Sequence, residues 1–597
     1  MASLARIPAA AATLLGLATA AVLIALAPLL VRSDYALFLL TQAAVLYLVA
    51  LGLNFLTGYV GITSIGHGAL VAIGAYATGI ATVDHGWPFW AGMALAILAT
   101  SLAGFLLALP AFRLSTWYFA LITLGFGSVV SGLIMELGWL THGFSGIVNV
   151  PLPEFFNVKM THRSLFWFVA GTGFVAFLIT RNLIGSRIGR AMLAVKESPL
   201  TAVSSGVRIG AVKIGAFVFS AALAGIAGAY FAANQSVITP DDFTIHFSIF
   251  FLLVIVLGGL GNLHGPLVGT AAFFLLPYLM TGLSEWRLLI YATGLLFLTI
   301  MFPKGLVGLL TQVMRPLIGQ KPRTIVPDAG GDIPVADNIS VSIRNVHISF
   351  GGVHAVNDVS LDVPAGTIHG IIGPNGSGKT TLVNLICGFY EPDHGSITIG
   401  GMEAVGVAPD ALARAGVRRT FQTPKLIPDL SILDNVVFGA YADEKASVLS
   451  LALALPPARR EAARLRAQAM RYIDFVGLAS QADAPAGEIP HGQRRLAEIA
   501  RALAGRPRLL LLDEPAAGLS LAELDSLQRV IAAIARSGTT VIIVEHHLEL
   551  ISSLCARVSV LDRGRLVREG TPAEVFADPE VLAIYMGRRA VKTVNAA

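Results

Sequence analysis

Cysteine is nearly absent from this sequence, which has only Cys387 and Cys555 among its 597 residues. Neither cysteine lies in a spacing that is typical of a metal site or a redox motif. We therefore expect both to be buried structural side chains. So little cysteine excludes a fold held by disulfides and fits a reducing cytosol.

Charge is also scarce, and its distribution along the chain is uneven. Asp, Glu, Lys and Arg make up 13% of the residues. Residues 1–320 hold 14 Lys and Arg and 8 Asp and Glu, whereas residues 321–597 hold 28 and 29. The net charge of +5 therefore comes from the first part, and it gives no support for nucleic-acid binding. Composition alone divides the chain into an apolar part and a part typical of a soluble domain.

The apolar part contains hydrophobic runs close to the ~20 residues that cross a bilayer core, which predicts a polytopic α-helical membrane domain with about eight to ten spans. The first run is also compatible with a signal peptide, but its length and the runs behind it favour a membrane helix. Glycines interrupt the third and eighth runs, which indicates close helix packing or broken helices around a solute path. The runs cover residues 9–31, 35–57, 62–83, 88–110, 116–138, 164–180, 212–234, 247–283 and 287–303.

Two loops of the apolar part, residues 181–213 and 304–323, are rich in Lys and Arg. Such loops usually face the cytoplasm, so we expect the part of the chain that follows to be cytoplasmic. Within the first loop, residues 185–206 (GSRIGRAMLAVKESPLTAVSSG) are too polar to span a membrane and predict a short helix. A solvated basic loop is the alternative.

A segment rich in Pro, Gly and Asp, residues 316–338, predicts an exposed linker. Behind it, the alternating apolar residues of ISVSIRNVHISF and VSLDVP predict strands. TIHGIIG predicts a further strand that leads into a glycine-rich turn. The soluble part is therefore expected to be an α/β domain.

The turn reads GPNGSGKT and matches the phosphate-binding pattern G-x-x-x-x-G-K-[ST] between a predicted strand and a predicted helix. Its glycines let successive backbone N–H groups surround phosphates, while Lys379 supplies positive charge and the Thr380 hydroxyl ligates Mg²⁺. The pattern predicts a P-loop NTPase that binds ATP. Its predicted ATP-binding residues are Gly373, Pro374, Asn375, Gly376, Ser377, Gly378, Lys379, Thr380 and Thr381.

Acidic residues follow the apolar run LLLL at 509–512, which is typical of a buried parallel strand. We expect Asp513 to hold Mg²⁺ through water and Glu514 to activate the attacking water as a general base. A second apolar run, residues 541–544, leads through Glu545 to His546. His546 is expected to sense the γ-phosphate, and His547 is the alternative.

Gln422 lies in the sequence RTFQ, 43 residues after Lys379. A glutamine at this place can contact Mg²⁺ or the attacking water and transmit a signal to the membrane part. We therefore include it among the catalytic and the metal-binding residues.

The order and spacing of these motifs resemble the nucleotide-binding domain of ABC transporters. The resemblance implies that Phe350 stacks on adenine and that IPHGQ, residues 489–493, is the signature segment. Gly492 and Gln493 match the family pattern and are expected at the ATP site. Pro490 stands where the family has a serine for the γ-phosphate of the opposite ATPase, so the two ATP sites of a pair are not expected to be equal. Ser520 likewise replaces an aspartate of the D-loop.

Longer segments resemble the hydrophobic amino acid uptake family. FGGVHAVNDVSLDV, GPNGSGKTTLVNLICGFY and DEPAAGL are similar to its LivG ATPases. NFLTGYVGITSIGHGALVAIGAYA and VLGGLGNLHGPLVG are similar to its LivM permeases. The chain thus resembles a LivM–LivG fusion, with a permease over 1–315 and an ATPase over 339–590. Residues 185–206 resemble the coupling loop, whose matching positions are Glu197 and Gly206.

This resemblance implies half of an ATP-driven importer in the bacterial inner membrane, with a cytoplasmic ATPase, because ABC ATPases work in pairs. The implied partners are a LivH-like permease, a LivF-like ATPase, a periplasmic solute-binding protein, membrane lipid and a small solute, and no nucleic acid. The solute is expected to be a branched-chain or other hydrophobic amino acid, with urea, amides or aromatic acids as alternatives. A homodimeric exporter and an ATP-gated channel or sensor also stay open.

Overall fold

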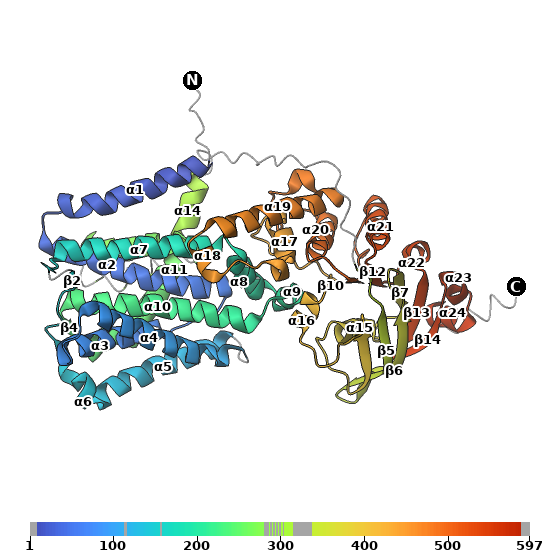
Figure 1. Ribbon diagram of the computed structural model, residues 1–597, viewed down its shortest axis with the longest axis horizontal. Helices are drawn as coiled ribbons and strands as arrows, with labels where there is room; N and C mark the ends of the chain where they lie inside the picture. The colour runs from blue at the N-terminus through green and yellow to red at the C-terminus, as the bar shows by residue number, and fades with distance from the viewer. Residues whose placement is uncertain are drawn as a thin grey trace, which may run out of the picture. The chain divides into compact units, whose positions relative to one another are not determined.

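A computed structural model describes residues 9–112, 116–155, 158–279, 304–314 and 337–586, and a few positions between 286 and 301. The chain divides into two compact units, each of which is seen in Figure 1. One unit comprises Met1–Met192 and Gly210–Lys321, and the other comprises Leu193–Ile209 and Pro322–Ala597. Most of the predicted linker 316–338 and of the predicted span 287–303 lies outside the described residues.

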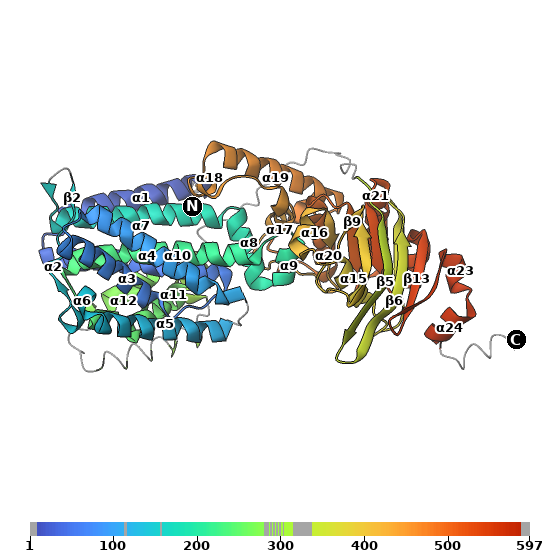
Figure 2. The same cartoon turned by 60° about the horizontal axis from the view of Figure 1, so that its bottom comes forward.

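The first unit, called the permease unit after the function expected from the sequence, is built of apolar helices that run alongside one another (Figures 1 and 2). Among the described residues, five helical stretches are long and apolar enough to cross a membrane: Asp34–Val60, Phe89–Ala108, Thr116–Glu136, His162–Ile184 and Ile209–Gln235. Shorter apolar helices cover Leu17–Leu30, Ile245–Gly258 and Gly265–Phe274. A polytopic helical domain is thus confirmed, while the number of eight to ten spans stays a prediction.

The described elements of this unit are mainly helices. The helices are α1 (Ala9–Leu30), α2 (Asp34–Leu53), α3 (His67–Gly79), α4 (Phe89–Ala108), α5 (Thr116–Glu136), α6 (Gly138–Thr141), α7 (His162–Ile184), α8 (Arg187–Glu197), α10 (Ile209–Gln235), α11 (Ile245–Gly258), α12 (Gly265–Leu279) and α14 (Gly305–Met314). The π-helical turns η1 (Asn54–Val60) and η2 (Ile80–Asp84) extend α2 and α3. The short strands β1 (Ile147–Val148) and β4 (Val237–Ile238) pair antiparallel, as do β2 (Glu154–Phe155) and β3 (Val158–Lys159).

The predicted span over 247–283 is interrupted, since α11 ends at Gly258 and α12 begins at Gly265. The connection lies against η1, where the Asn54 amide donates to the carbonyl of Asn262 (2.9 Å) and accepts from the N–H of Gly261 (2.9 Å). Because buried backbone polar groups need partners in an apolar environment, a buried asparagine suits a broken helix. The predicted glycine interruption is therefore confirmed.

The second unit, the ATPase unit, contains a six-stranded sheet in the order β10-β11-β12-β7-β13-β14. The first five strands are parallel and β14 is antiparallel to β13. These strands are β7 (Ile368–Ile372), β10 (Val417–Arg419), β11 (Leu509–Asp513), β12 (Thr540–Val544), β13 (Arg557–Asp562) and β14 (Arg565–Gly570). A four-stranded antiparallel sheet has the order β6-β5-β8-β9, with β5 (Val341–Phe350), β6 (Val353–Val363), β8 (His394–Ile399) and β9 (Met402–Glu403).

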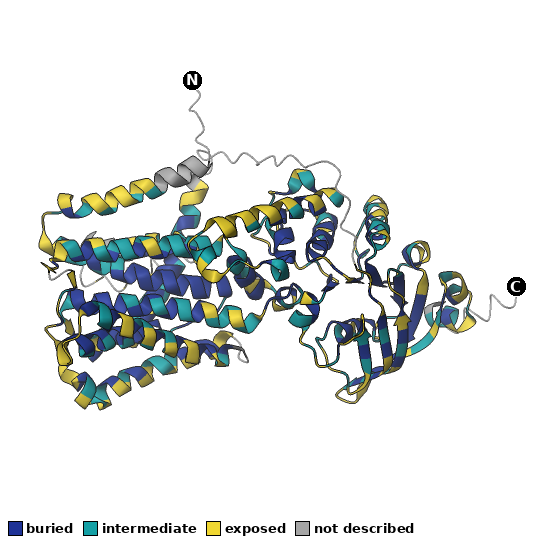
Figure 3. Ribbon diagram, in the orientation of Figure 1, coloured by how far each residue is buried: buried dark blue, intermediate teal, exposed yellow. Residues whose placement is uncertain are grey.

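The run LLLL at 509–512 lies in the interior strand β11 and is buried on both faces, as its composition predicts. Leu509 and Leu511 pack into the core cluster shared with β5 and β6, whereas Leu510 and Leu512 pack into the cluster under the helices of the opposite face. Figure 3 shows this buried interior within the unit. The α/β fold predicted for the soluble part is therefore confirmed.

The ATPase unit also contains helices, most of which lie between its strands along the chain. They are α9 (Pro199–Ser204), α15 (Lys379–Ile386), α16 (Pro409–Arg414), α17 (Ile432–Gly439), α18 (Val448–Ala452), α19 (Pro456–Phe475), α20 (His491–Ala504), α21 (Leu521–Arg536), α22 (Leu548–Leu554), α23 (Pro572–Phe576) and α24 (Pro579–Met586).

Candidate ATP site

The candidate site lies at the carboxyl ends of three adjacent parallel strands. In the sheet register, Asp513 of β11 is opposite Val544 of β12, and Val544 is opposite Ile371 of β7. The residues that follow these strands therefore meet at one edge, which is where open α/β sheets bind ligands. The three predicted motifs, over 373–380, 513–514 and 545–547, are brought together by this register.

The glycine-rich turn connects β7 to α15, as expected. Gly378 precedes α15 with φ +101°, and a Cβ there would overlap the carbonyl oxygen of Ala355. Only glycine fits both requirements. Inside the turn the Ser377 hydroxyl is buried and has no hydrogen-bond partner among the described residues. A buried polar group of this kind indicates a place for a ligand.

Lys379 is buried at the first position of α15. Its ammonium group donates to the carbonyl oxygens of Gly373 (2.8 Å) and Pro374 (2.9 Å), so it is held within the turn. Burial lowers the pKa of Lys379, and the nearby carboxylates of Glu514 and Asp513 oppose this shift. The following hydroxyl group, that of Thr380, belongs to an exposed residue.

Asp513 is buried and paired with Arg419, whose guanidinium donates to Oδ2 at 2.7 Å. Arg419 also donates to the side-chain oxygen of Asn384 on α15. This arginine lies in β10, the strand beside β11. Its role was not predicted from the sequence, although a buried acid beside the phosphate turn requires a cationic partner.

Glu514 has φ +46°, an unusual backbone conformation for a residue other than glycine. Its N–H donates to the carbonyl oxygen of Val544 (2.8 Å), which holds the residue at the end of β12. The amide nitrogen of Gln422 donates to the Glu514 carboxylate at 2.7 Å. The two predicted catalytic residues therefore contact each other, and the strained backbone directs Glu514 out of the strand.

The residues after β12 are arranged around a buried carboxylate. Glu545 accepts hydrogen bonds from the backbone N–H groups of Ala516 (2.7 Å), His546 (2.9 Å) and His547 (3.3 Å). The His546 side chain is 61% exposed, with Nδ1 3.7 Å from the Glu545 carboxylate. Glu545 thus fixes the backbone of both histidines, and the ring of His546 is accessible to a ligand.

Phe350, the residue expected to stack on adenine, ends β5 and is exposed. The ring of Tyr390 lies 5.2 Å away in an edge-to-face arrangement. An exposed aromatic pair of this kind offers a surface on which a flat base can stack. Tyr390 was not assigned from the sequence.

The signature segment leads into α20, with Pro490 just before the helix and His491 at its first position. A Cβ at Gly492 would overlap the carboxylate of Glu523. Glu523 accepts hydrogen bonds from the N–H (2.9 Å) and hydroxyl (2.7 Å) of Ser520, and these bonds lower its pKa. Ser520, one of the two departures from the family pattern, therefore binds the acidic residue that lies against Gly492 of the signature segment.

Three charged side chains of α20 form a buried network that the sequence analysis did not assign. Glu498 is fully buried and lies 3.3 Å from Arg495 and 3.1 Å from Arg501. Arg495 donates to the carbonyl oxygens of Phe421, Gln422 and Glu514. Burial raises the pKa of Glu498, and the two arginines oppose that rise. The network therefore connects α20 to the backbone of Phe421, Gln422 and Glu514.

Residues 193–209 belong to the ATPase unit by their contacts. The Ser204 carbonyl accepts from Arg418 (3.1 Å), and the Thr201 hydroxyl donates to the carbonyl of Lys425 (3.4 Å). The N–H of Lys425 in turn donates to Glu498 (3.2 Å). The predicted coupling segment thus reaches the backbone that the buried network of α20 holds.

The segment forms two helices, α8 and α9, instead of the one short helix that was expected. Gly206 is buried with φ +86°, and a Cβ there would lie 3.2 Å from Cγ of Arg414. Glu197 is exposed, and it makes no hydrogen bond or ion pair with the residues that the structure describes. Gly206 therefore packs against Arg414 of the ATPase unit, whereas Glu197 has no polar partner among the described residues, and a coupling role for either residue stays a prediction.

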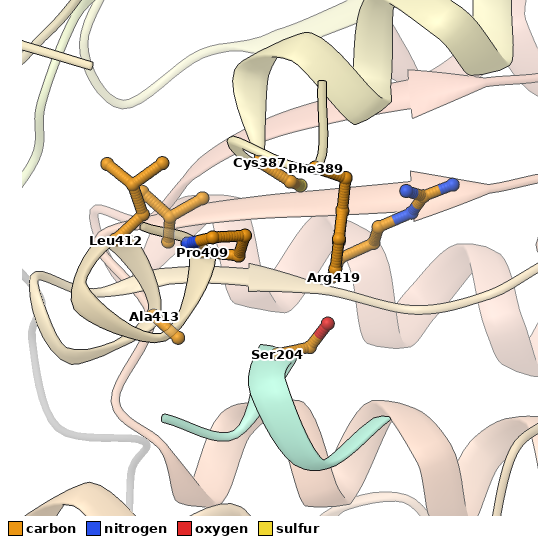
Figure 4. Close-up of a pocket in the computed structure, with 8 residues that line it drawn as sticks. Ser204, Cys387, Phe389, Pro409, Leu412, Ala413 and Arg419 are labelled. Carbon is orange, nitrogen blue, oxygen red and sulfur yellow. The ribbon is translucent and has the colours of Figure 1, made fainter. Parts of the chain in front are cut away.

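Ser204 also lines a small cavity of about 10 Å³ with Cys387, Phe389 and Arg419 (Figure 4). Burial raises the pKa of the Cys387 thiol to about 11, so this cysteine is not a reactive group. Both cysteines are buried, which confirms the structural role expected for them.

Comparison with known proteins identifies both parts of the chain. Residues 35–302 match the family described as the permease component of the branched-chain amino acid transport system, and residues 356–517 match the ABC transporter family.

The ATPase part has relatives of similar length. Over 248 residues, the chain is 34% identical to the high-affinity branched-chain amino acid transport ATP-binding protein LivG of Salmonella typhimurium and 35% identical to BraF of Pseudomonas aeruginosa. Each alignment covers 41% of this chain and 97% of the relative. A solved nucleotide-free ATP-binding cassette from an ABC transporter is 30% identical, with a TM-score of 0.37, over 42% of this chain and all of that one.

A permease family thus matches most of the apolar part, and ATP-binding transport proteins match nearly all of the ATPase unit. The chain therefore belongs to the ABC transporter family and joins, in one polypeptide, a membrane permease and an ATPase that couples ATP hydrolysis to transport.

Proposed function

We propose that this protein is the LivM–LivG-like half of an importer for branched-chain or other hydrophobic amino acids. The observation that carries the proposal is the pairing of a permease match over residues 35–302 with ATPase relatives that are named for branched-chain amino acid transport. The permease would comprise residues 1–315 with about eight to ten spans, followed by a linker over 316–338 and the ATPase over 339–590.

ATP would bind along the turn from Gly373 to Thr381. Lys379 neutralises the β- and γ-phosphates, and the base stacks on Phe350, beside Tyr390. The buried, unpaired hydroxyl of Ser377 supports a phosphate ligand within this turn. The signature residues Gly492 and Gln493 of each ATPase would complete the site of the opposite one.

Mg²⁺ fits the oxygen donors at the same place. Thr380 offers a hydroxyl, Gln422 an amide oxygen and Asp513 a carboxylate, and hard oxygen donors of this kind suit the ion. When bound, Mg²⁺ neutralises charge on the β- and γ-phosphates. The pairing with Arg419 holds the Asp513 carboxylate in place.

Hydrolysis would begin with the Glu514 carboxylate, which takes a proton from a water molecule as that water attacks the γ-phosphorus. The bond from the γ-phosphorus to the bridging oxygen breaks, and ADP leaves with the electron pair. Gln422 holds Glu514 through its 2.7 Å hydrogen bond, and His546 contacts the γ-phosphate. Because Arg495 binds the carbonyls of both Gln422 and Glu514, a movement of the signature helix displaces both residues together.

The complete importer would contain a LivH-like permease, a LivF-like ATPase and a periplasmic solute-binding protein, since one ATPase cannot close both ATP sites. It would lie in the bacterial inner membrane with the ATPase unit in the cytoplasm. Contacts of residues 198–208, including Gly206, would pass ATPase closure to the permease helices. Pro490 replaces the serine that caps the γ-phosphate, so the site completed by this signature would turn over more slowly than the other.

The test is uptake of radioactive leucine by proteoliposomes that contain the full complex and a saturating binding protein. Leucine uptake that requires ATP inside the proteoliposomes supports the proposal, and ATP-dependent uptake of urea without leucine uptake contradicts it. In the same complex, Glu514→Gln should lower hydrolysis at this site by 10²-fold or more, the order of a general-base contribution, while ATP binding persists. Unchanged hydrolysis would show that Glu514 is not the base.

A further inference from the structure

The permease unit contains a cavity of about 410 Å³ between α3, α5 and the turn that precedes α11. This volume lies within the range of small-molecule sites. The walls come from the beginning of α3, one face of α5, the short helix η5 (Pro240–Phe243) and the first turn of α11. Chain segments more than a hundred residues apart in the sequence thus enclose one space.

One carboxylate lines this cavity. Asp241 is exposed to it and makes no hydrogen bond or ion pair with the described residues. The neighbouring Asp242, in contrast, accepts hydrogen bonds from the N–H (2.8 Å) and hydroxyl (2.9 Å) of Thr239 and stabilises its own turn. Asp242 is therefore already bound within its own turn, whereas the Asp241 carboxylate has no partner among the described residues and can bind a cation.

Hydroxyl groups of α5 lie on the same cavity wall. The Ser131 hydroxyl donates to the carbonyl of Gly127 (3.1 Å) within its own helix. Its oxygen lone pairs are then still available as acceptors. An ammonium group, which only donates hydrogen bonds, can therefore find acceptors in this cavity at Asp241 and at the Ser131 oxygen.

The first turn of α11 carries partial positive charge, opposite in sign to the Asp241 carboxylate. Thr244, the residue before this helix of 14 residues, makes no side-chain hydrogen bond to the first turn. The first N–H groups of a helix attract anions, because they lack intrahelical partners and carry the positive end of the helix dipole. The Ser248 hydroxyl, which accepts from the N–H of Gly68 (3.0 Å), has its own proton available for the same anion.

The remaining wall is apolar, with Leu124, Met135 and Phe243 among its residues. We propose that the cavity is a solute subsite for an α-amino acid with an aliphatic side chain. Its ammonium group would lie at Asp241 and its carboxylate at the beginning of α11, with the side chain against this apolar wall. This inference rests on the proposed function and adds residues of the permease that select the solute.

Glycines of α5 provide a way to fill the cavity without disturbing the fold. Gly127 and Gly132 both line it, and a Cβ at either position would meet nothing within 4 Å. Gly125 also has nothing within 4 Å of its Cβ position, but it does not line the cavity. Gly125→Val is therefore a matched control on the same helix.

The experiment measures leucine and alanine uptake and basal ATP hydrolysis by the reconstituted complex. Gly132→Val should lower leucine uptake at least tenfold and alanine uptake less, because the larger solute loses more room. Gly125→Val should stay within twofold of the parent for both solutes. Basal ATP hydrolysis should be unchanged in both variants, since neither residue belongs to the ATPase unit.

Two substitutions, Asp241→Asn and Asp241→Glu, test whether the Asp241 carboxylate binds the ammonium group of the solute. The first should raise the KM for leucine at least tenfold at unchanged basal hydrolysis, and the second should restore most of the affinity. If Gly132→Val does not assemble, leucine uptake by Gly127→Val and the KM for leucine of Asp241→Asn still test the subsite. Loss of assembly in all cavity variants, with Gly125→Val assembled, would show that this surface is a subunit interface and would overturn the subsite.

Failure of the subsite can be told from failure of the proposed function. If the parent complex imports leucine and the cavity variants match it, the subsite is wrong and the importer stands. If the parent complex imports urea and no leucine, the proposed function is wrong, and the assignment of an amino-acid subsite falls with it.

Discussion

Removal of the Glu498 carboxylate is expected to destabilise the ATPase unit strongly. Glu498 is fully buried on α20 between Arg495 and Arg501, at 3.3 and 3.1 Å. Glu498→Ala would leave two buried guanidinium groups beside each other without their shared carboxylate. It would also leave the N–H of Lys425 without its acceptor.

The expected loss follows from the burial of these charges. Removing one partner of a buried ion pair costs about 3–5 kcal/mol, because the other charge stays buried without compensation. A domain has a free energy of unfolding of about 5–15 kcal/mol, so the loss is a large share of it. For a domain of this size, each kcal/mol lowers Tm by about 2–4 °C. We therefore expect the ATPase unit of Glu498→Ala to unfold about 10 °C below the parent.

Differential scanning fluorimetry of the purified full chain measures this change. Asp525→Ala, which alters an exposed acid of α21, serves as the control and should lie within about 0.5 kcal/mol of the parent. Hydrolysis should fall in Glu498→Ala even at temperatures where the unit is folded, because Arg495 also positions the Gln422 and Glu514 carbonyls. Equal Tm values for Glu498→Ala and Asp525→Ala would refute the reasoning.

Three further predictions concern acid stability, the phosphate turn and coupling. Burial lowers the pKa of His369 to about 4 from 6.5, so the unfolded state binds a proton first as pH falls. The contribution of this histidine to the free energy of unfolding is complete above pH 6.5, is smaller by about 2 kcal/mol at pH 5 and declines further toward pH 4. Urea titrations at pH 7 and 5 should therefore show a smaller loss of this free energy for His369→Leu than for the parent. Gly378→Ala should abolish binding of a fluorescent ATP analogue, since its Cβ overlaps Ala355, whereas Gly376→Ala, whose Cβ meets nothing within 4 Å, should reduce binding less. Gly206→Val should lower leucine uptake tenfold or more at unchanged basal hydrolysis, because the strain at φ +86° displaces the segment that contacts Arg414; a parallel fall of both rates would contradict a coupling role.

Much of the secondary structure of this protein could be predicted from local residue patterns in its sequence. Hydrophobic runs give membrane helices because each run is as long as the bilayer core is thick. The turn GPNGSGKT predicts the phosphate loop, and the run LLLL predicts a strand buried on both faces. Both predictions depend only on a few neighbouring residues, since glycine allows the turn conformation and a continuous apolar run indicates burial on two sides. These features are properties of short segments, so no knowledge of distant contacts is needed.

The tertiary structure alone decided the contacts that link these segments. Arg419 pairs with Asp513 across 94 positions, Arg495 binds the Gln422 carbonyl across 73, and Thr201 reaches Lys425 across 224. The break after α11 likewise depends on Asn54, more than two hundred residues away. Burial of a charged or polar group requires a partner, but many residues can supply one. Only the folded packing selects which residue does so, and for that reason the network that positions Gln422 and Glu514 was not predictable from the sequence.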